Sequence, residues 1–88
     1  MVLELYREQY QVKSGWASQC VPLGLTAHGP NPEVADKNLE RSVRLFLAPF
    51  QRDGTLQDEI HALGLSSVDA SDDVQIILKW MGIKSKGL

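Results

Sequence analysis

The sequence predicts an α+β domain in the order βββα(α)β, a small antiparallel-rich sheet with one main helix packed on one face. Three observations support this prediction. The first 29 residues alternate apolar and polar side chains between glycine and proline breaks, a capped amphipathic segment begins at Asn31, and a β-branched apolar run begins near residue 74. An 88-residue chain has room for one domain, which we place at residues 1–80, followed by a short C-terminal tail at residues 81–88.

The N-terminal part predicts three strands, over residues 2–12, 16–21 and 25–28. Leu3 and Leu5 alternate with polar residues, so an extended chain points both of them to one face. Gly15 ends a short polar turn, which predicts a β-hairpin. Pro22 then interrupts the second strand before the third begins.

The main helix is predicted from Pro32 to about Leu47. Asn31 is a good N-cap, and a proline at the first helical position loses no hydrogen bond that the helix needs. Pro49 disfavours helical backbone at the residue before it, which predicts the end of the helix there. Apolar residues at three- and four-residue spacing predict a buried stripe of Ala35, Leu39, Val43 and Phe46. Polar residues are expected on the opposite, solvated side, at Asp36, Lys37, Glu40 and Arg44.

A second, shorter helix and a fourth strand are predicted in the C-terminal part. Thr55 resembles a capping residue, and Gly64 marks the end of this helix. Its buried side is expected to carry Leu56, Ile60 and Leu63. Residues 66–73 read as a polar linker, and the apolar run 74–80 predicts a strand at the centre or the edge of the sheet.

Composition and charge exclude several classes of protein. The net charge is −2 with acids and bases interspersed, so the broad basic surface of a nucleic-acid binder is missing. The lone Cys20 excludes an intramolecular disulfide, and no stretch approaches the roughly 20 apolar residues of a membrane span. We expect a soluble, cytoplasmic protein with no membrane contact. Three lysines near the C-terminus indicate either a phosphate contact or, more commonly, a solvated basic tail: Lys79, Lys84 and Lys86.

The side chains that could perform chemistry are scattered. His28 and His61 fall on different elements, with no cysteine or carboxylate at metal-ligand spacing, so we expect no metal site. Cys20 has no adjacent histidine and reads as a small buried hydrophobe. The glycine spacing forms no phosphate-binding loop, which predicts no nucleotide cofactor. Three carboxylates are candidates for a divalent-metal site: Glu4, Glu40 and Asp73. The favoured interpretation is that all three are solvated surface acids. We therefore expect a protein that is not an enzyme, with no catalytic residues and no cofactor.

A more specific pattern runs through the middle of the chain. It comprises Gly15-Trp16-Ala17-Ser18-Gln19-Cys20, then Leu23-Gly24, then Gly29-Pro30-Asn31-Pro32-Glu33-Val34-Ala35, then Asn38-Leu39, and then Val43, Leu45, Phe46 and Leu47. This pattern resembles HicB-family antitoxins, in which a Gly-aromatic-x-Ala-x-Cys strand leads through Leu-Pro-Gly to a short strand and then to Gly-x-Thr-x-Glu-Glu-Ala at the start of a helix. The loop at residues 21–24 is one residue shorter here and lacks the proline before glycine.

The resemblance implies a truncated RNase H-like fold that is catalytically silent and self-associates. The partner that it implies is a HicA-type toxin, a small ribonuclease that cleaves messenger RNA and is silenced by occlusion of its active site. Many family members continue into a DNA-binding domain. Nothing after Trp80 is long enough to supply one, so we expect no direct DNA binding.

The leading hypothesis is therefore a stand-alone HicB-like antitoxin, or an orphan relative, that works by binding a protein. The candidate partner interface comprises Tyr6, Tyr10, Trp16 and His28. We expect Trp16 to lie with the tyrosines on the sheet face that the helix leaves bare, although packing of Trp16 in the monomer core is an equal alternative. A second hypothesis is a non-catalytic oligomer of the same fold, a dimer or a tetramer, with no toxin. A third, an active RNase H-like nuclease, requires converging carboxylates.

Overall fold

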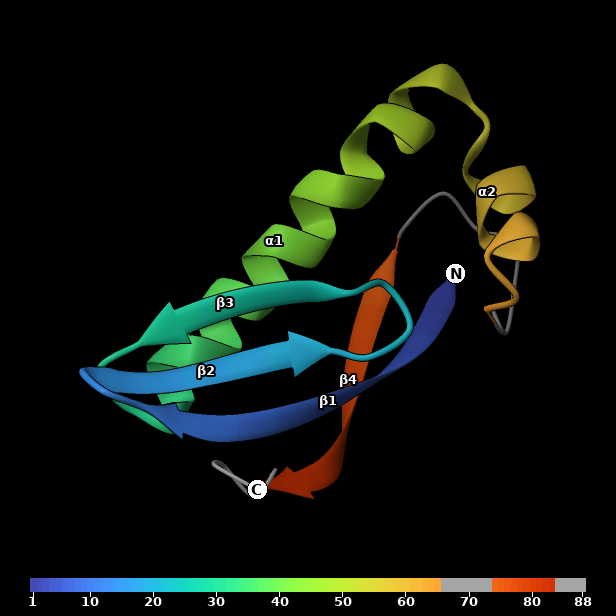
Figure 1. Ribbon diagram of the computed structural model, residues 1–88. Coiled ribbons are helices and arrows are strands. Elements are labelled where there is room, and N and C mark those ends of the chain that lie inside the picture. Colours follow the sequence, from blue (N-terminus) through green and yellow to red (C-terminus); the bar gives the residue numbers. More distant parts are fainter. Residues whose placement is uncertain (66–73, 84–88) are drawn as a thin grey trace.

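The computed structural model describes residues 1–65 and 74–83, and Figure 1 shows how their elements are arranged. In these residues the elements follow in the order β1 (Val2–Val12), β2 (Gly15–Cys20), β3 (Leu25–Gly29), α1 (Pro32–Asp53), α2 (Leu56–Ala62) and β4 (Gln75–Ile83). The predicted α+β class and the order βββα(α)β are confirmed. The predicted linker at 66–73 and the last part of the predicted tail, 84–88, lie outside the described residues.

The strands form one mixed sheet in the order β3-β2-β1-β4. The pairings of β1 with β2 and of β2 with β3 are antiparallel, whereas β4 lies parallel to β1. A two-residue turn between Val12 and Gly15 closes the first hairpin. The strand that comes last in the sequence therefore lies beside the first and forms one edge of the sheet.

Alternation along the strands gives the sheet two different faces. Leu3 and Leu5 on β1 are fully buried, and the strand register places Cys20 and Ala27 on the same side. Helix α1 lies across this side (Figure 1), which we call the helix-covered face. The buried residues of α1 are Ala35, Leu39, Val43 and Leu47. The core thus lies between α1 and one face of the sheet, and we call the other side the open face.

The start of α1 agrees with the sequence prediction. The side-chain oxygen of Asn31 accepts a hydrogen bond from the backbone N–H of Val34 at 2.9 Å, which is the expected N-cap. The first turn of the helix packs directly on the end of β3. A Cβ atom added to Gly29 would lie 2.5 Å from the backbone nitrogen of Ala35, so this contact requires glycine.

The predicted end of α1 is wrong, because the helix continues through Pro49 to Asp53. A proline inside a helix removes one hydrogen bond and is unfavourable by about 3 kcal/mol. The rings of Phe46 and Phe50 pack edge to face with their centroids 5.7 Å apart, and both pack against the core. This apolar packing offsets the effect of the proline, and the helix ends instead at Gly54, which takes a left-handed conformation.

The C-terminal elements follow the prediction in type but not in every detail. Leu56 and Ile60 of α2 are buried as expected, whereas Leu63 is 38% exposed because the helix ends before it, at Ala62. The side chain of Thr55 makes no capping hydrogen bond. The fourth strand extends to Ile83, so the predicted start of the tail at residue 81 is wrong and residues 81–83 belong to β4. In the part of the chain that the structure describes, neither helix is long and apolar enough to cross a membrane.

Candidate functional site

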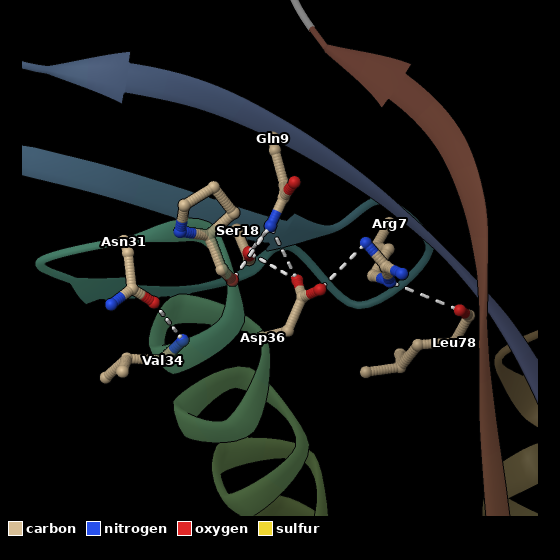
Figure 2. Close-up of polar contacts among 8 residues, drawn as sticks. Arg7, Gln9, Ser18, Asn31, Val34, Asp36 and Leu78 are labelled. Carbon is tan, nitrogen blue, oxygen red and sulfur yellow. Dashed lines mark hydrogen bonds and ion pairs between the residues drawn. The ribbon is translucent and has the colours of Figure 1, made fainter.

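A cluster of polar side chains lies between the N-terminal part of α1 and the middle of the sheet (Figure 2). The alternation of β1 and β2 directs Gln9 and Ser18 toward the helix-covered face, where both are buried. The carboxylate of Asp36 meets them there. Its Oδ1 atom accepts hydrogen bonds from Ser18 Oγ at 2.6 Å and from Gln9 Nε2 at 2.9 Å. The amide of Gln9 also donates to the backbone carbonyl of Pro32, at 3.0 Å.

Arg7 connects this cluster to the edge strand β4. Its Nη1 atom lies 2.9 Å from Oδ2 of Asp36, and its Nε atom donates to the carbonyl of Leu78 at 3.2 Å. The guanidinium carbon also lies 4.8 Å from the centroid of the Trp80 ring, in cation–π geometry. We call the set of Arg7, Gln9, Ser18 and Asp36 the polar junction, because it joins α1, β1, β2 and β4.

The position of Asp36 corrects the sequence prediction, which placed this residue on the solvated side of the helix. Asp36 lies at the margin of the apolar stripe, and the sheet below it carries polar side chains at two inward-facing positions. Those positions need a polar partner, because an unpaired buried polar group is costly. The signal in the sequence was that Gln9 and Ser18 occupy strand positions on the same face as the buried Leu5 and Cys20.

The carboxylates considered for a metal site do not converge in the structure. Glu4 pairs with Lys79 at 3.0 Å, and Glu40 pairs with Arg44 at 3.3 Å. Asp73 lies outside the described residues. Within residues 1–65 and 74–83, no three histidine, cysteine, aspartate or glutamate side chains are grouped so that they could hold a metal ion. Glu4 and Glu40 thus each form an ion pair with a basic side chain and do not approach one another as metal ligands.

Three of the four candidate interface residues lie on the open face. The register places Tyr10, Ala17 and His28 in one row across β1, β2 and β3, and Tyr6 lies further along β1 on the same side. Tyr6 is 44% exposed, His28 is exposed and Tyr10 is half-buried. Ala17 is fully buried although it lies on this face, since larger side chains flank it in the row.

Trp16 lies on the other side of the sheet. It is opposite Gln11 and Gly29 in the register, which places it on the helix-covered face, half-buried near the start of α1. The expectation that Trp16 shares the bare face with the two tyrosines is wrong. Its position favours the packing alternative, and its role as an interface anchor stays a prediction.

Sequence reasoning did not identify the apolar surface at the β4 edge. Exposed apolar side chains gather there, with Ile77 at 38%, Trp80 at 49% and Met81 at 54% exposure. In the described residues β4 has a strand neighbour only on its β1 side. The signal in the sequence was that β4 carries a single charged residue, Lys79, whereas edge strands are commonly protected by charges.

Among the described side chains, Cys20 and Lys79 have shifted pKa values. Burial raises the pKa of the Cys20 thiol, which lies in the core, so Cys20 behaves as the small hydrophobe that the sequence predicted. The hydrogen bond from Lys79 to Glu4 raises the pKa of the Lys79 ammonium group. Lys79 is thus occupied within the chain, and the two other lysines of the predicted basic tail lie outside the described residues.

The fold and these contacts define a small α+β protein with one packed sheet face, a hydrogen-bonded polar junction, and exposed aromatic and aliphatic side chains on the open face and the β4 edge. Comparisons with protein-family models, with curated proteins and with solved structures find no match for this chain.

Proposed function

We propose that this chain is a protein-binding module, a HicB-like antitoxin or an orphan relative, that neutralises a small HicA-type ribonuclease toxin in the cytoplasm by occluding its active site. The resemblance over residues 15–47 supports this proposal. The observed sheet, with one face covered by one main helix, fits the fold that the resemblance implies.

The observation that carries the proposal is the presentation of aromatic side chains on the open face. Tyr6, Tyr10 and His28 come from β1 and β3 and lie on one side, away from α1. Within residues 1–65 and 74–83, helix α1 lies on the other side of the sheet (Figure 1), and the segment after α2, residues 63–65, lines a pocket with Glu4 and Tyr6. Tyrosine is enriched among residues that dominate binding energy, because its large ring packs well and its hydroxyl forms hydrogen bonds.

The contacts of the acidic residues weigh against a nuclease. A metal-dependent nuclease needs carboxylates free to coordinate a divalent ion. Asp36 instead pairs with Arg7, and Glu4 pairs with Lys79. The proposal therefore assigns no catalytic role and no cofactor to this chain. It also assigns no direct DNA binding, because the net charge is −2.

Co-expression with the neighbouring small open reading frame tests the proposal. The expected result is a complex that is recovered by pull-down and that relieves the growth arrest caused by the toxin alone. Tyr6→Ala and Tyr10→Ala should each weaken the complex at least about tenfold, as expected for aromatic interface anchors. Lys37→Ala, an exposed substitution on α1, serves as the matched control and should leave the affinity unchanged.

Absence of a complex together with persistent toxicity would refute the antitoxin assignment. A complex that the tyrosine substitutions leave intact would refute the open face as its binding site. The second candidate function, a non-catalytic oligomer without a toxin, is favoured by a separate observation, the apolar edge strand β4.

A further inference from the structure

The two edges of the sheet differ in length and in polarity. β3 is five residues long, and its open-face side chains, Thr26 and His28, are polar. β4 is nine residues long and carries exposed apolar side chains. Edge strands are normally protected by short length, by charge or by proline, since an unprotected edge pairs with another strand. The one charge on β4, Lys79, is already paired with Glu4, so little in this strand opposes pairing.

A groove lies on the helix-covered face beside β4. It has a volume of about 350 Å³ and separates the C-terminal half of α1 from the start of β4. Its lining is mainly apolar, with two arginines: Arg41, Arg44, Leu45, Leu47, Ala48, Gln51, Val74 and Ile76. Leu45 is 68% exposed, the highest exposure among the large apolar side chains of the described chain. Apolar walls with nearby guanidinium groups suit an aromatic side chain.

The sequence of β4 permits antiparallel pairing with a second copy of itself. A two-fold axis perpendicular to the sheet keeps each face on its own side, so residues of the helix-covered face oppose residues of that face. An axis at Leu78 opposes Ile76 with Trp80, an aromatic and β-branched pair of the kind that stabilises sheets. An axis at Lys79 would instead oppose two ammonium groups. The favoured register therefore brings Trp80 of one copy beside Ile76 of the other, and Ile76 lines the groove.

The polar junction prepares Trp80 for this contact. Arg7 lies against the Trp80 ring and is itself held by Asp36 and by the carbonyl of Leu78. A side chain that is ordered before association loses less conformational entropy when the complex forms. The Leu78 carbonyl keeps a second lone pair for a bond to a neighbouring strand.

From these observations we infer that two copies of this chain pair antiparallel along β4, with the axis at Leu78, and that Trp80 of each copy enters the α1–β4 groove of the other. The occupant of the edge is a second copy because one patch supplies both the aromatic side chain and the groove that receives it, as a two-fold interface requires. The inference rests on the self-association part of the proposed function and is independent of the toxin.

Sedimentation equilibrium of the full chain tests the inference. The wild type should be dimeric, and Trp80→Ala and Leu45→Glu should each weaken the dimer at least about tenfold. Val21→Glu places a charge at a 44% exposed apolar site in the turn between β2 and β3, and it should leave the dimer unchanged. Circular dichroism of each variant checks that it is folded. The inference is overturned if the wild type stays monomeric up to about 1 mM. It is also overturned if neither Trp80→Ala nor Leu45→Glu weakens the dimer.

Disulfide trapping tests the register. Directly opposed residues in an antiparallel pair have Cα atoms about 4.5–5.5 Å apart, which a disulfide can bridge. Oxidation of Leu78→Cys should therefore give a covalent dimer, whereas Thr26→Cys on the opposite edge should not. The native Cys20 is fully buried and serves as a common background in both variants. A covalent dimer from Thr26→Cys alone overturns pairing along β4, although it leaves self-association itself supported. The binding of a toxin by the tyrosine variants is measured in a separate experiment, so failure of one proposal is distinguished from failure of the other.

Discussion

Of the partly exposed acidic residues in this protein, Asp36 is the one whose replacement should destabilise the fold most. In Asp36→Ala the buried hydroxyl of Ser18 loses its acceptor, while Gln9 keeps its bond to the Pro32 carbonyl. A buried donor left without a partner costs about 1–3 kcal/mol. The ion pair with Arg7, whose side chains are 20% and 28% exposed, adds at most about 1 kcal/mol. The expected loss is therefore about 1–4 kcal/mol, a large share of the stability of a small domain.

Urea denaturation followed by circular dichroism measures this loss as a lower midpoint at an unchanged m-value. Asp36→Asn keeps an acceptor for Ser18 but loses the charge, so its effect should lie between those of wild type and alanine. Glu40→Ala is the matched control on the same helix. It breaks an ion pair with Arg44 whose side chains are about half exposed, and it should cost less than about 0.5 kcal/mol. Equal midpoints for Asp36→Ala and Glu40→Ala would refute the assignment of the polar junction as a stabilising element.

Three further outcomes are expected, the first two in the same urea denaturation assay and the third in thermal melts. Gly29→Ala should lower the free energy of unfolding by at least about 1–3 kcal/mol, because the added Cβ meets the backbone nitrogen of Ala35. Gly24→Ala is the control. It has open space around its Cβ and should lose only the smaller amount that a left-handed alanine costs. Asn31→Ala removes the N-cap and should lose about 1 kcal/mol. Burial raises the pKa of the Cys20 thiol above its unfolded value near 8.5, so stability should be retained below that pH and fall as the pH rises above it. Thermal melts between about pH 7 and pH 10 should show this fall in the wild type and a smaller one in Cys20→Ala, and equal slopes would count against the burial argument.

The element types could be predicted because local signals and packing agree in this chain. Alternation in residues 2–12 and the Asn31-Pro32 start of α1 both match the structure. Pro49 shows where local reasoning fails, because its effect on the backbone is smaller than the gain from packing Phe46 and Phe50. That gain depends on a core that is built from distant strands and is not visible in the local sequence.

The candidate site was only partly predictable, for a similar reason. Tyr6 and Tyr10 were found because alternation along one strand places them on one face. The face of Trp16 depends on the register between two strands, and a shift of one residue reverses it. The hydrogen bond from Arg7 to Leu78 joins residues 71 positions apart in the sequence, so neither this contact nor the exposure of the β4 edge could be derived from local pattern.

The parallel pairing of β1 with β4 has a consequence for how the protein is made. β1 is synthesised early and can form its hairpin with β2 at once, but its second neighbour is added only after both helices. Contacts between distant parts of a chain form slowly, because the intervening loop must close first. During synthesis the edge of β1 that pairs with β4 is therefore exposed to other chains until β4 leaves the ribosome. This interval is the stage at which misassembly or capture by a chaperone is expected to be most frequent.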